Sequence, residues 1–259
     1  MNVSYRRLRE DLEALGVRSG DVLVVHSSMK SMGAVEGGPE TVLAALSDTV
    51  GVCGTLLFPT FTYATSYADS FYSNRETPSC VGLLSEVFRR LPGVIRTDHP
   101  THSVALRGRL AASLCEGEWQ DDTPMGAHSP YRRLAGVGAG ILMLGCPPSH
   151  NSYLHALEEE AGVPYALRGH QEYTVVDACE KTRRRRVRRH NFVRADGCVY
   201  QRYERAVALL EEGGVRSGSL HGAPSLLFDA ATLRLRALAK MAEDPFFFVD
   251  DPKGYYAHP

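Results

Sequence analysis

The chain has 259 residues, of which 44% are hydrophobic and 23% charged, and its formal net charge at pH 7 is −1. This balance is typical of a globular protein that buries a substantial core, and it lacks the excess of basic charge usual in nucleic-acid-binding domains. No apolar run approaches the roughly 20 residues that span a membrane, and residues 1–16 form an amphipathic pattern without the apolar core of a signal peptide. We therefore expect one domain over residues 1–259, located in the cytoplasm.

Hydrophobic periodicity predicts strands and helices in alternation along the chain. Helices are expected at Tyr5 to Leu15, Glu40 to Val50, Gly82 to Leu91, Pro130 to Leu134 and Ser152 to Ala161. Strands are expected at Val22 to His26, Thr55 to Pro59, Val94 to Arg96 and Gly140 to Cys146. This order favours an α/β fold with a central mixed or parallel sheet covered by helices.

The second part of the chain is expected to continue with strands and then helices. Strands are predicted from Gln171 to Val193, within a subsidiary strand region at 170–200, and a helix from Tyr203 to Glu212. Ala223 to Ala242 is interpreted as a short loop followed by one long helix, with Asp229 as the N-cap.

A hydroxyl- and glycine-rich turn follows the first predicted strand. The segment HSSMKSMGAVEGGPET, from His26 to Thr41, contains Ser27, Ser28, Lys30 and the glycine pair Gly37 and Gly38 before an apolar helical pattern. Backbone amides at such a turn and at the next helix N-terminus can hold phosphate oxygens. The segment matches neither GxxxxGK[ST] nor GxGxxG, so taken alone it is better explained as an ordinary strand-loop-helix connection.

His155 and Glu158 form a candidate general-base pair. Residues three apart share one face of a helix, so Glu158 can hold one imidazole nitrogen protonated while the other accepts a proton. Asn151 is placed to cap this helix, which should end by Gly162. Without further context a solvated surface pair explains the same residues.

Four segments in this order and spacing resemble the aminoglycoside N3-acetyltransferase family, whose fold is unrelated to that of the GCN5-type acetyltransferases. They are His26–Thr41, Gly54–Thr62, Arg96–Ser103 and Asn151–Glu158, and the resemblance extends from about Gly20 to Pro164. It implies an acetyl-coenzyme A-dependent enzyme in which His155 is the general base and Glu158 its orienting partner. Ser152 or Tyr153 stands where the family motif usually has threonine.

The resemblance also implies a coenzyme site and a class of acceptor. Ser103 and Val104 are expected beside the pantetheine or thioester, and the preceding turn is expected to hold the coenzyme through Ser27, Ser28, Met29, Lys30, Gly37 and Gly38. The acceptor is expected to be an aminoglycoside or a related amino sugar. Antibiotic resistance is the associated property, although the family includes members whose natural acceptor is not an antibiotic.

Cysteines offer an alternative chemistry. Cys146 precedes the helix that bears His155 and Glu158, so a Cys-His-Glu triad with an acetyl-enzyme is conceivable. A cysteine after an apolar strand is more often a packed hydrophobe, however, and the resembled family uses no cysteine nucleophile. Across the chain, six cysteines show neither a CxxC pair nor a Cys/His metal spacing, so we expect reduced thiols and no metal site.

An arginine run, KTRRRRVRRH from Lys181 to His190, has seven Lys/Arg in ten positions. Such a run can bind nucleic acid or a partner, contact the coenzyme phosphates or an anionic acceptor, or form a solvated strand face.

The sequence thus predicts an acetyl-coenzyme A-dependent N-acetyltransferase that acts on a small-molecule amine in a ternary complex. We expect no nucleic-acid or membrane partner, and a homodimer is a possible oligomeric state. The alternatives are an acyltransferase for another natural-product amine, a non-catalytic coenzyme A-binding protein and a nucleic-acid-binding protein.

Overall fold

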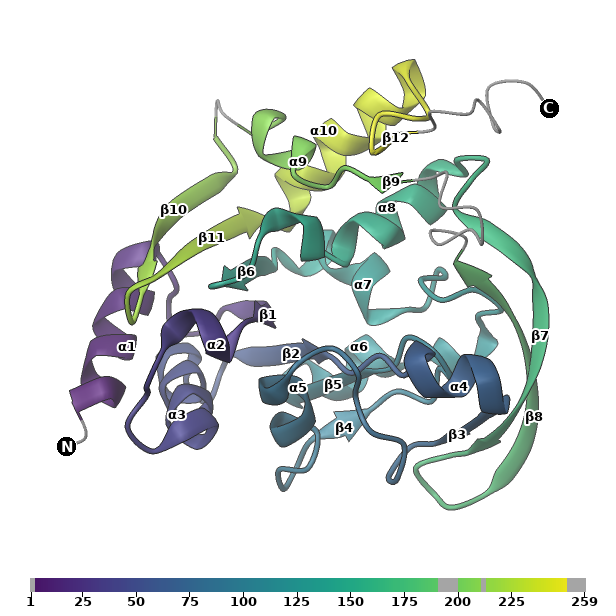
Figure 1. The fold of residues 1–259 in the computed structure, drawn as a ribbon, viewed down its shortest axis with the longest axis horizontal. Helices are drawn as coiled ribbons and strands as arrows, with labels where there is room; N and C mark the ends of the chain where they lie inside the picture. The colour runs from purple at the N-terminus through teal and green to yellow at the C-terminus, as the bar shows by residue number, and fades with distance from the viewer. Residues whose placement is uncertain (1–2, 191–199, 211–212, 251–259) are drawn as a thin grey trace.

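The protein is built around a mixed central sheet (Figure 1). The structure, a computed structural model, describes residues 3–190, 200–210 and 213–250. Within them the main sheet has seven strands, in the order β10 (Val215–Leu220), β11 (Ala223–Asp229), β6 (Gly140–Leu144), β1 (Val22–Ser27), β2 (Thr55–Pro59), β5 (Val104–Gly108) and β4 (Ile95–Arg96). β1 pairs in parallel with β2 and β6, and the other neighbours are antiparallel. The predicted α/β fold is therefore confirmed, with a mixed sheet.

Helices cover both faces of this sheet. α1 (Val3–Leu15), α3 (Gly38–Val50) and α5 (Leu83–Phe88) pack on the face that carries Leu23 and Val25. Alternate residues of the same strand, Val22 and Val24, face a second core that includes α6 (Ala111–Cys115), α7 (Pro130–Arg133), α8 (Tyr153–Ala161) and α10 (Ala230–Glu243). Because side chains alternate across a strand, a strand covered on both faces becomes a continuous apolar run.

Two smaller sheets flank the main one. β7 (Leu167–Val176) and β8 (Thr182–His190) form a long curved hairpin at the right edge of Figure 1, and β3 (Phe71–Ser73) pairs with β7. β9 (Tyr200–Gln201) pairs with β12 (Val249–Asp250) near the C-terminus. The shorter helices are α2 (Met29–Met32), α4 (Tyr63–Asp69), α9 (Arg205–Ala208) and the 3₁₀ turns η1 (Glu118–Gln120), η2 (Ala135–Val137) and η3 (Pro148–His150).

Most predicted elements are present, and the corrections concern the C-terminal third. The expected loop after Ala223 is wrong, because these residues form β11, which pairs with both β10 and β6. Asp229 does cap α10, accepting a hydrogen bond from the Thr232 amide at 2.7 Å. The helix expected from Tyr203 is shorter, since α9 spans only Arg205–Ala208. Of the expected 171–193 strands and 203–212 helix, residues 191–193 and 211–212 lie outside the described residues.

No helix in the described ranges is long and apolar enough to cross a membrane.

Candidate active site

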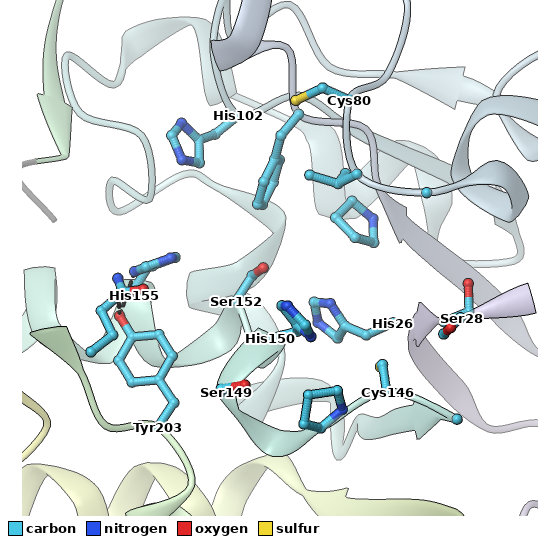
Figure 2. Close-up of a pocket in the computed structure, with 18 of the residues that line it drawn as sticks. His26, Ser28, Cys80, His102, Cys146, Ser149, His150, Ser152, His155 and Tyr203 are labelled. Carbon is cyan, nitrogen blue, oxygen red and sulfur yellow. Dashed lines mark hydrogen bonds between the residues drawn. The ribbon is translucent and has the colours of Figure 1, made fainter. Parts of the chain in front are cut away.

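A cavity of about 480 Å³ lies at the carboxyl ends of the three parallel strands. His26 and Ser27 end β1, Pro59 ends β2, and Gly145 and Cys146 follow β6, and all five line it. α3, which follows β1, and α8, which follows β6, pack on opposite faces of the sheet, and the crevice between two such connections is the usual ligand site of α/β sheets. Figure 2 shows Ser28 at the right of the cavity, His155 and Tyr203 at the left, and His26 between them.

The predicted phosphate-binding turn contributes hydroxyl groups to the cavity. Ser27, Ser28 and Ser31 line it. The Ser28 amide donates to the Leu144 carbonyl at 2.9 Å, and the Ser28 hydroxyl caps α2 by accepting from the Ser31 amide at 3.4 Å. The Ser28 and Ser31 amides are thus engaged within the protein, while the serine side chains of this turn line the cavity.

Other residues predicted to hold the coenzyme lie outside the cavity lining. Met29 is partly buried and Lys30 exposed on α2, while Gly37 and Gly38 form the start of α3. Gly37 and Gly38 have φ values of 77° and 64°, a backbone region that strongly favours glycine. These residues border the same turn, so only an extended ligand that leaves the cavity would meet them.

Ser103 and Val104 are not among the described residues that line the cavity, and their expected position beside the thioester stays a prediction. The Ser103 side chain is fully buried, donates to the Thr60 carbonyl at 2.7 Å and accepts from Arg96 Nε at 3.1 Å. Val104 begins β5 and is 1% exposed. The Ser103 hydroxyl therefore holds a buried arginine side chain in place.

The helix that bears His155 and Glu158 forms as predicted. Asn151 Oδ1 accepts from the Tyr153 amide at 3.1 Å, and α8 ends at Gly162 in the left-handed conformation. His155 lines the cavity with 13% of its side chain exposed, whereas the side chain of Glu158 is fully buried. The pair is therefore not a solvated surface pair.

A tyrosine lies between the two predicted partners. The Tyr203 hydroxyl is 2.5 Å from His155 Nδ1 and donates to Glu158 Oε2 at 2.5 Å, whereas the direct Nδ1 to Oε2 distance is 3.5 Å. Tyr165 donates to the other oxygen of Glu158 at 2.7 Å. A distance of 3.5 Å is too long for a strong hydrogen bond, so the main contact between histidine and carboxylate runs through Tyr203. Sequence reasoning missed Tyr203, because it is 48 positions away from His155.

Further histidine side chains lie close to His155. The ring of His190 is 4.8 Å from that of His155 and 4.6 Å from that of His102. Burial lowers the pKa of His102 and His190 well below the ordinary value and that of His26 to about 3, so all three are neutral at neutral pH. His190 Nε2 is 2.5 Å from Glu159 Oε1, and burial raises the pKa of Glu159 to about 7.

The cavity wall carries little formal charge. Among the described residues that line it, none is an aspartate, glutamate, lysine or arginine. Burial raises the pKa of the Cys146 thiol, which also lines it, to about 12. In the described part of the chain no group of three or more His, Cys, Asp and Glu side chains is arranged to hold a metal ion.

Comparisons with known proteins show which proteins the chain is similar to. The chain is 36% identical over 181 residues to aminoglycoside N(3)-acetyltransferase VII of Streptomyces paromomycinus, a match that covers 62% of each protein's length. It superimposes on a histidine-to-alanine mutant of the aminoglycoside acetyltransferase AAC(3)-IVa in complex with a gentamicin with a TM-score of 0.81, at 28% identity over 94% of this chain and 90% of that one. It also superimposes on AAC-IIIb in a binary complex with CoASH with a TM-score of 0.77, at 26% identity over 92% of this chain and 96% of that one.

A family model described as aminoglycoside 3-N-acetyltransferase matches residues 24–242, which include most of the central sheet and the whole cavity wall. With the fold, the cavity and the histidine-bearing helix in agreement, the chain belongs to the aminoglycoside 3-N-acetyltransferase family.

Proposed function

We propose that the protein transfers the acetyl group of acetyl-coenzyme A to an amine of an aminoglycoside or a related amino sugar, with His155 as the general base. The observation that carries the proposal is a histidine that faces the cavity while its Nδ1 is held by buried groups. The family match and the solved relatives with CoASH and with a gentamicin support both substrates.

The chemistry that we propose for His155 is the transfer of one proton from the amine to the leaving thiolate. As the amine nitrogen forms its bond to the thioester carbon, Nε2 of His155 takes the amine proton. The carbon–sulfur bond then breaks, and the same proton can pass to the departing thiolate, which leaves as the free thiol. Nδ1 keeps its own proton throughout, since the buried tyrosine and carboxylate hold that side of the ring.

We assign the serine end of the cavity to the coenzyme and the histidine end to the acceptor amine. Ser27, Ser28 and Ser31 offer hydroxyl groups suited to the polar pantetheine arm and the phosphates. A thioester that enters from this end points towards His155 at the other end (Figure 2).

A second class of acceptor is favoured by one observation. A polycationic aminoglycoside is best held by carboxylates, yet the described cavity lining has none. An amine with fewer positive charges, such as a monoamino sugar or another natural-product amine, would fit this wall. A panel that contains both kinds of amine separates the two candidates.

The direct test follows thiol release from acetyl-coenzyme A with this panel of amines. Transfer to at least one amine is expected, and His155→Ala should lower kcat by roughly 10²- to 10⁴-fold, the usual contribution of a positioned base. Coenzyme A binding, measured by calorimetry, should change little in this variant because the serine end of the cavity is intact.

His150→Ala serves as the matched control, since His150 also lines the cavity but is exposed and lies outside the hydrogen bonds to Glu158. It should lose far less activity than His155→Ala. A His155→Ala enzyme as active as the parent, or a parent that neither binds coenzyme A nor releases thiol with any amine, would refute the proposed function.

A further inference from the structure

We propose that Tyr203 is a positioning residue that relays the hydrogen bond between His155 and Glu158 and thereby fixes which imidazole nitrogen takes the proton of the acceptor. This inference rests on the proposed function of His155. It replaces a direct histidine–carboxylate pair by a three-membered chain in which the phenol is the central group.

The number of available donors decides which atoms carry protons in the hydrogen-bonded series His155, Tyr203 and Glu158. Glu158 accepts phenolic protons at both oxygens, from Tyr203 at 2.5 Å and from Tyr165 at 2.7 Å. A phenol has one proton, so once Tyr203 donates to the carboxylate its oxygen can only accept from His155. His155 Nδ1 must then carry a proton, and the basic lone pair belongs to Nε2. The chain therefore selects the tautomer that general-base catalysis requires.

The phenol keeps its proton under all working conditions. Burial and the neighbouring Glu158 raise the pKa of Tyr203 well above its ordinary value of 10. Tyr203 is 1% exposed, so water does not compete for the hydroxyl. A phenol that stays neutral can donate to the carboxylate and accept from the imidazole at the same time.

The C-terminal part of the chain holds Tyr203 in place. The Arg202 amide donates to the Phe248 carbonyl at 2.8 Å as β9 pairs with β12, and the Phe248 ring lies edge-on to the Tyr203 ring at 6.0 Å. Both Arg202 and Arg205, on either side of Tyr203, contact the Asp250 carboxylate at 2.5 Å. Such support is expected for a side chain whose position matters to within a fraction of an ångström.

Tyr165 provides an unusual internal control. Both tyrosines are buried and both donate to Glu158, but among the described contacts only Tyr203 also lies against His155. A purely structural role, in which a phenol satisfies a buried carboxylate, predicts the same effect for either tyrosine. A relay predicts an effect of Tyr203 alone on the chemistry.

The experiment compares Tyr203→Phe with Tyr165→Phe on the whole protein, with the best acceptor from the amine panel. Tyr203→Phe should lower kcat by roughly 10- to 100-fold, the range expected when a hydrogen bond to a charged group is lost, with little change in the KM for acetyl-coenzyme A. The acidic limb of its kcat/KM profile should move to higher pH, because Glu158 loses one proton donor and stabilises the imidazolium more strongly. Tyr165→Phe should leave kcat much closer to that of the parent.

A second readout is independent of turnover. In ¹⁵N NMR of the histidine-labelled protein, the His155 signals, assigned by their loss in His155→Gln, should report the Nδ1–H tautomer in the parent and a mixture in Tyr203→Phe. Equal kinetic losses in the two tyrosine variants, or an unchanged pH limb and tautomer in Tyr203→Phe, would overturn the relay. A parent without acetyl transfer would instead overturn the proposed function, so the two failures are distinguishable.

Discussion

Cys146 illustrates how its surroundings decide the chemistry of one residue. Its position in the sequence before α8 is compatible with a Cys-His-Glu triad, but burial raises the pKa of its thiol to about 12. The thiolate, which is the nucleophilic form, is therefore scarce at neutral pH. The side of the His155 ring that a triad would use to contact Glu158 is also held by Tyr203.

We therefore predict that Cys146→Ser retains most of the activity. Mass spectrometry of the enzyme with acetyl-coenzyme A alone should show no acetylated protein, and initial-rate plots for the two substrates should intersect, as expected for direct transfer in a ternary complex. Cys80→Ser is the matched control, because Cys80 is the other cysteine among the described lining residues. An acetyl group found on Cys146 would show that the acyl group passes through the protein.

The arginine-rich strand β8 divides its side chains between two faces. Arg185 points inward, where it bonds Glu118 Oε1 at 3.0 Å and lies 4.9 Å from the centre of the Trp119 ring. Arg184 and Arg186 are exposed on the opposite face, and none of the three lines the cavity. The run is thus partly structural, and the alternation of a strand explains the division.

Substitutions on the two faces of β8 should have opposite outcomes. Arg184→Gln combined with Arg186→Gln should leave the kinetic constants unchanged and alter the free energy of unfolding by no more than about 0.5 kcal/mol, as usual for surface positions. Arg185→Gln should destabilise the protein by roughly 3 kcal/mol, because it leaves the Glu118 carboxylate buried without its partner. Urea denaturation measures both.

Measurements of kinetics and of nucleic-acid binding test whether the outer face of β8 has a binding role. If the outward double variant changed acceptor preference, or if the parent bound nucleic acid there with a steep salt dependence, the outer face of β8 would have a binding role.

At the scale of the whole molecule, buried histidines dominate the response to acid. Burial holds the pKa of His26, His99, His102 and His190 below the ordinary value of 6.5. A folded-state pKa below the unfolded one contributes stability that is present above about pH 6.5 and is lost as the pH falls. Glu159 acts in the opposite direction. Because its pKa is raised to about 7, its contribution lowers the free energy of unfolding progressively as the pH rises from 4.5. Burial also raises the pKa of Glu118 and Asp98, which act like Glu159, whereas arginine partners lower the pKa of Glu86 and Asp250, which act like the histidines. We expect the four histidines to outweigh the three raised carboxyl groups.

We expect the midpoint of thermal unfolding to be clearly lower at pH 5 than at pH 7.5. His102→Gln, which removes one buried titrating group, should reduce this difference, while His170→Gln on the exposed part of β7 should preserve it. Equal midpoints at the two pH values in the parent would mean that protonation of these histidines does not accompany unfolding.

Local pattern was sufficient to predict several strands and much of the site. β1, β2 and β6 are continuous apolar runs with turn residues at their ends, and α8 has a cap, an amphipathic face and a terminal glycine. His155 and Glu158 share a helix face through a spacing of three, which requires no knowledge of the rest of the chain. The β10–β11 hairpin was missed because Val215–Leu220 is rich in small polar residues, and only its pairing partners make it a strand.

The sequence by itself determined the α/β class, the main-sheet strands β1, β2, β4 and β6, the family, and the helix that bears His155. These follow from interactions between residues that are close along the chain, and from motifs whose spacing is local. Only the tertiary structure decided that the Ser103 hydroxyl holds Arg96, that Arg185 is buried, and that Tyr203 contacts both His155 and Glu158. The contacts of Ser103 with Thr60, Arg185 with Glu118 and Tyr203 with His155 join residues that are 43, 67 and 48 positions apart, and a buried polar group takes whichever partner the packing of such distant segments provides.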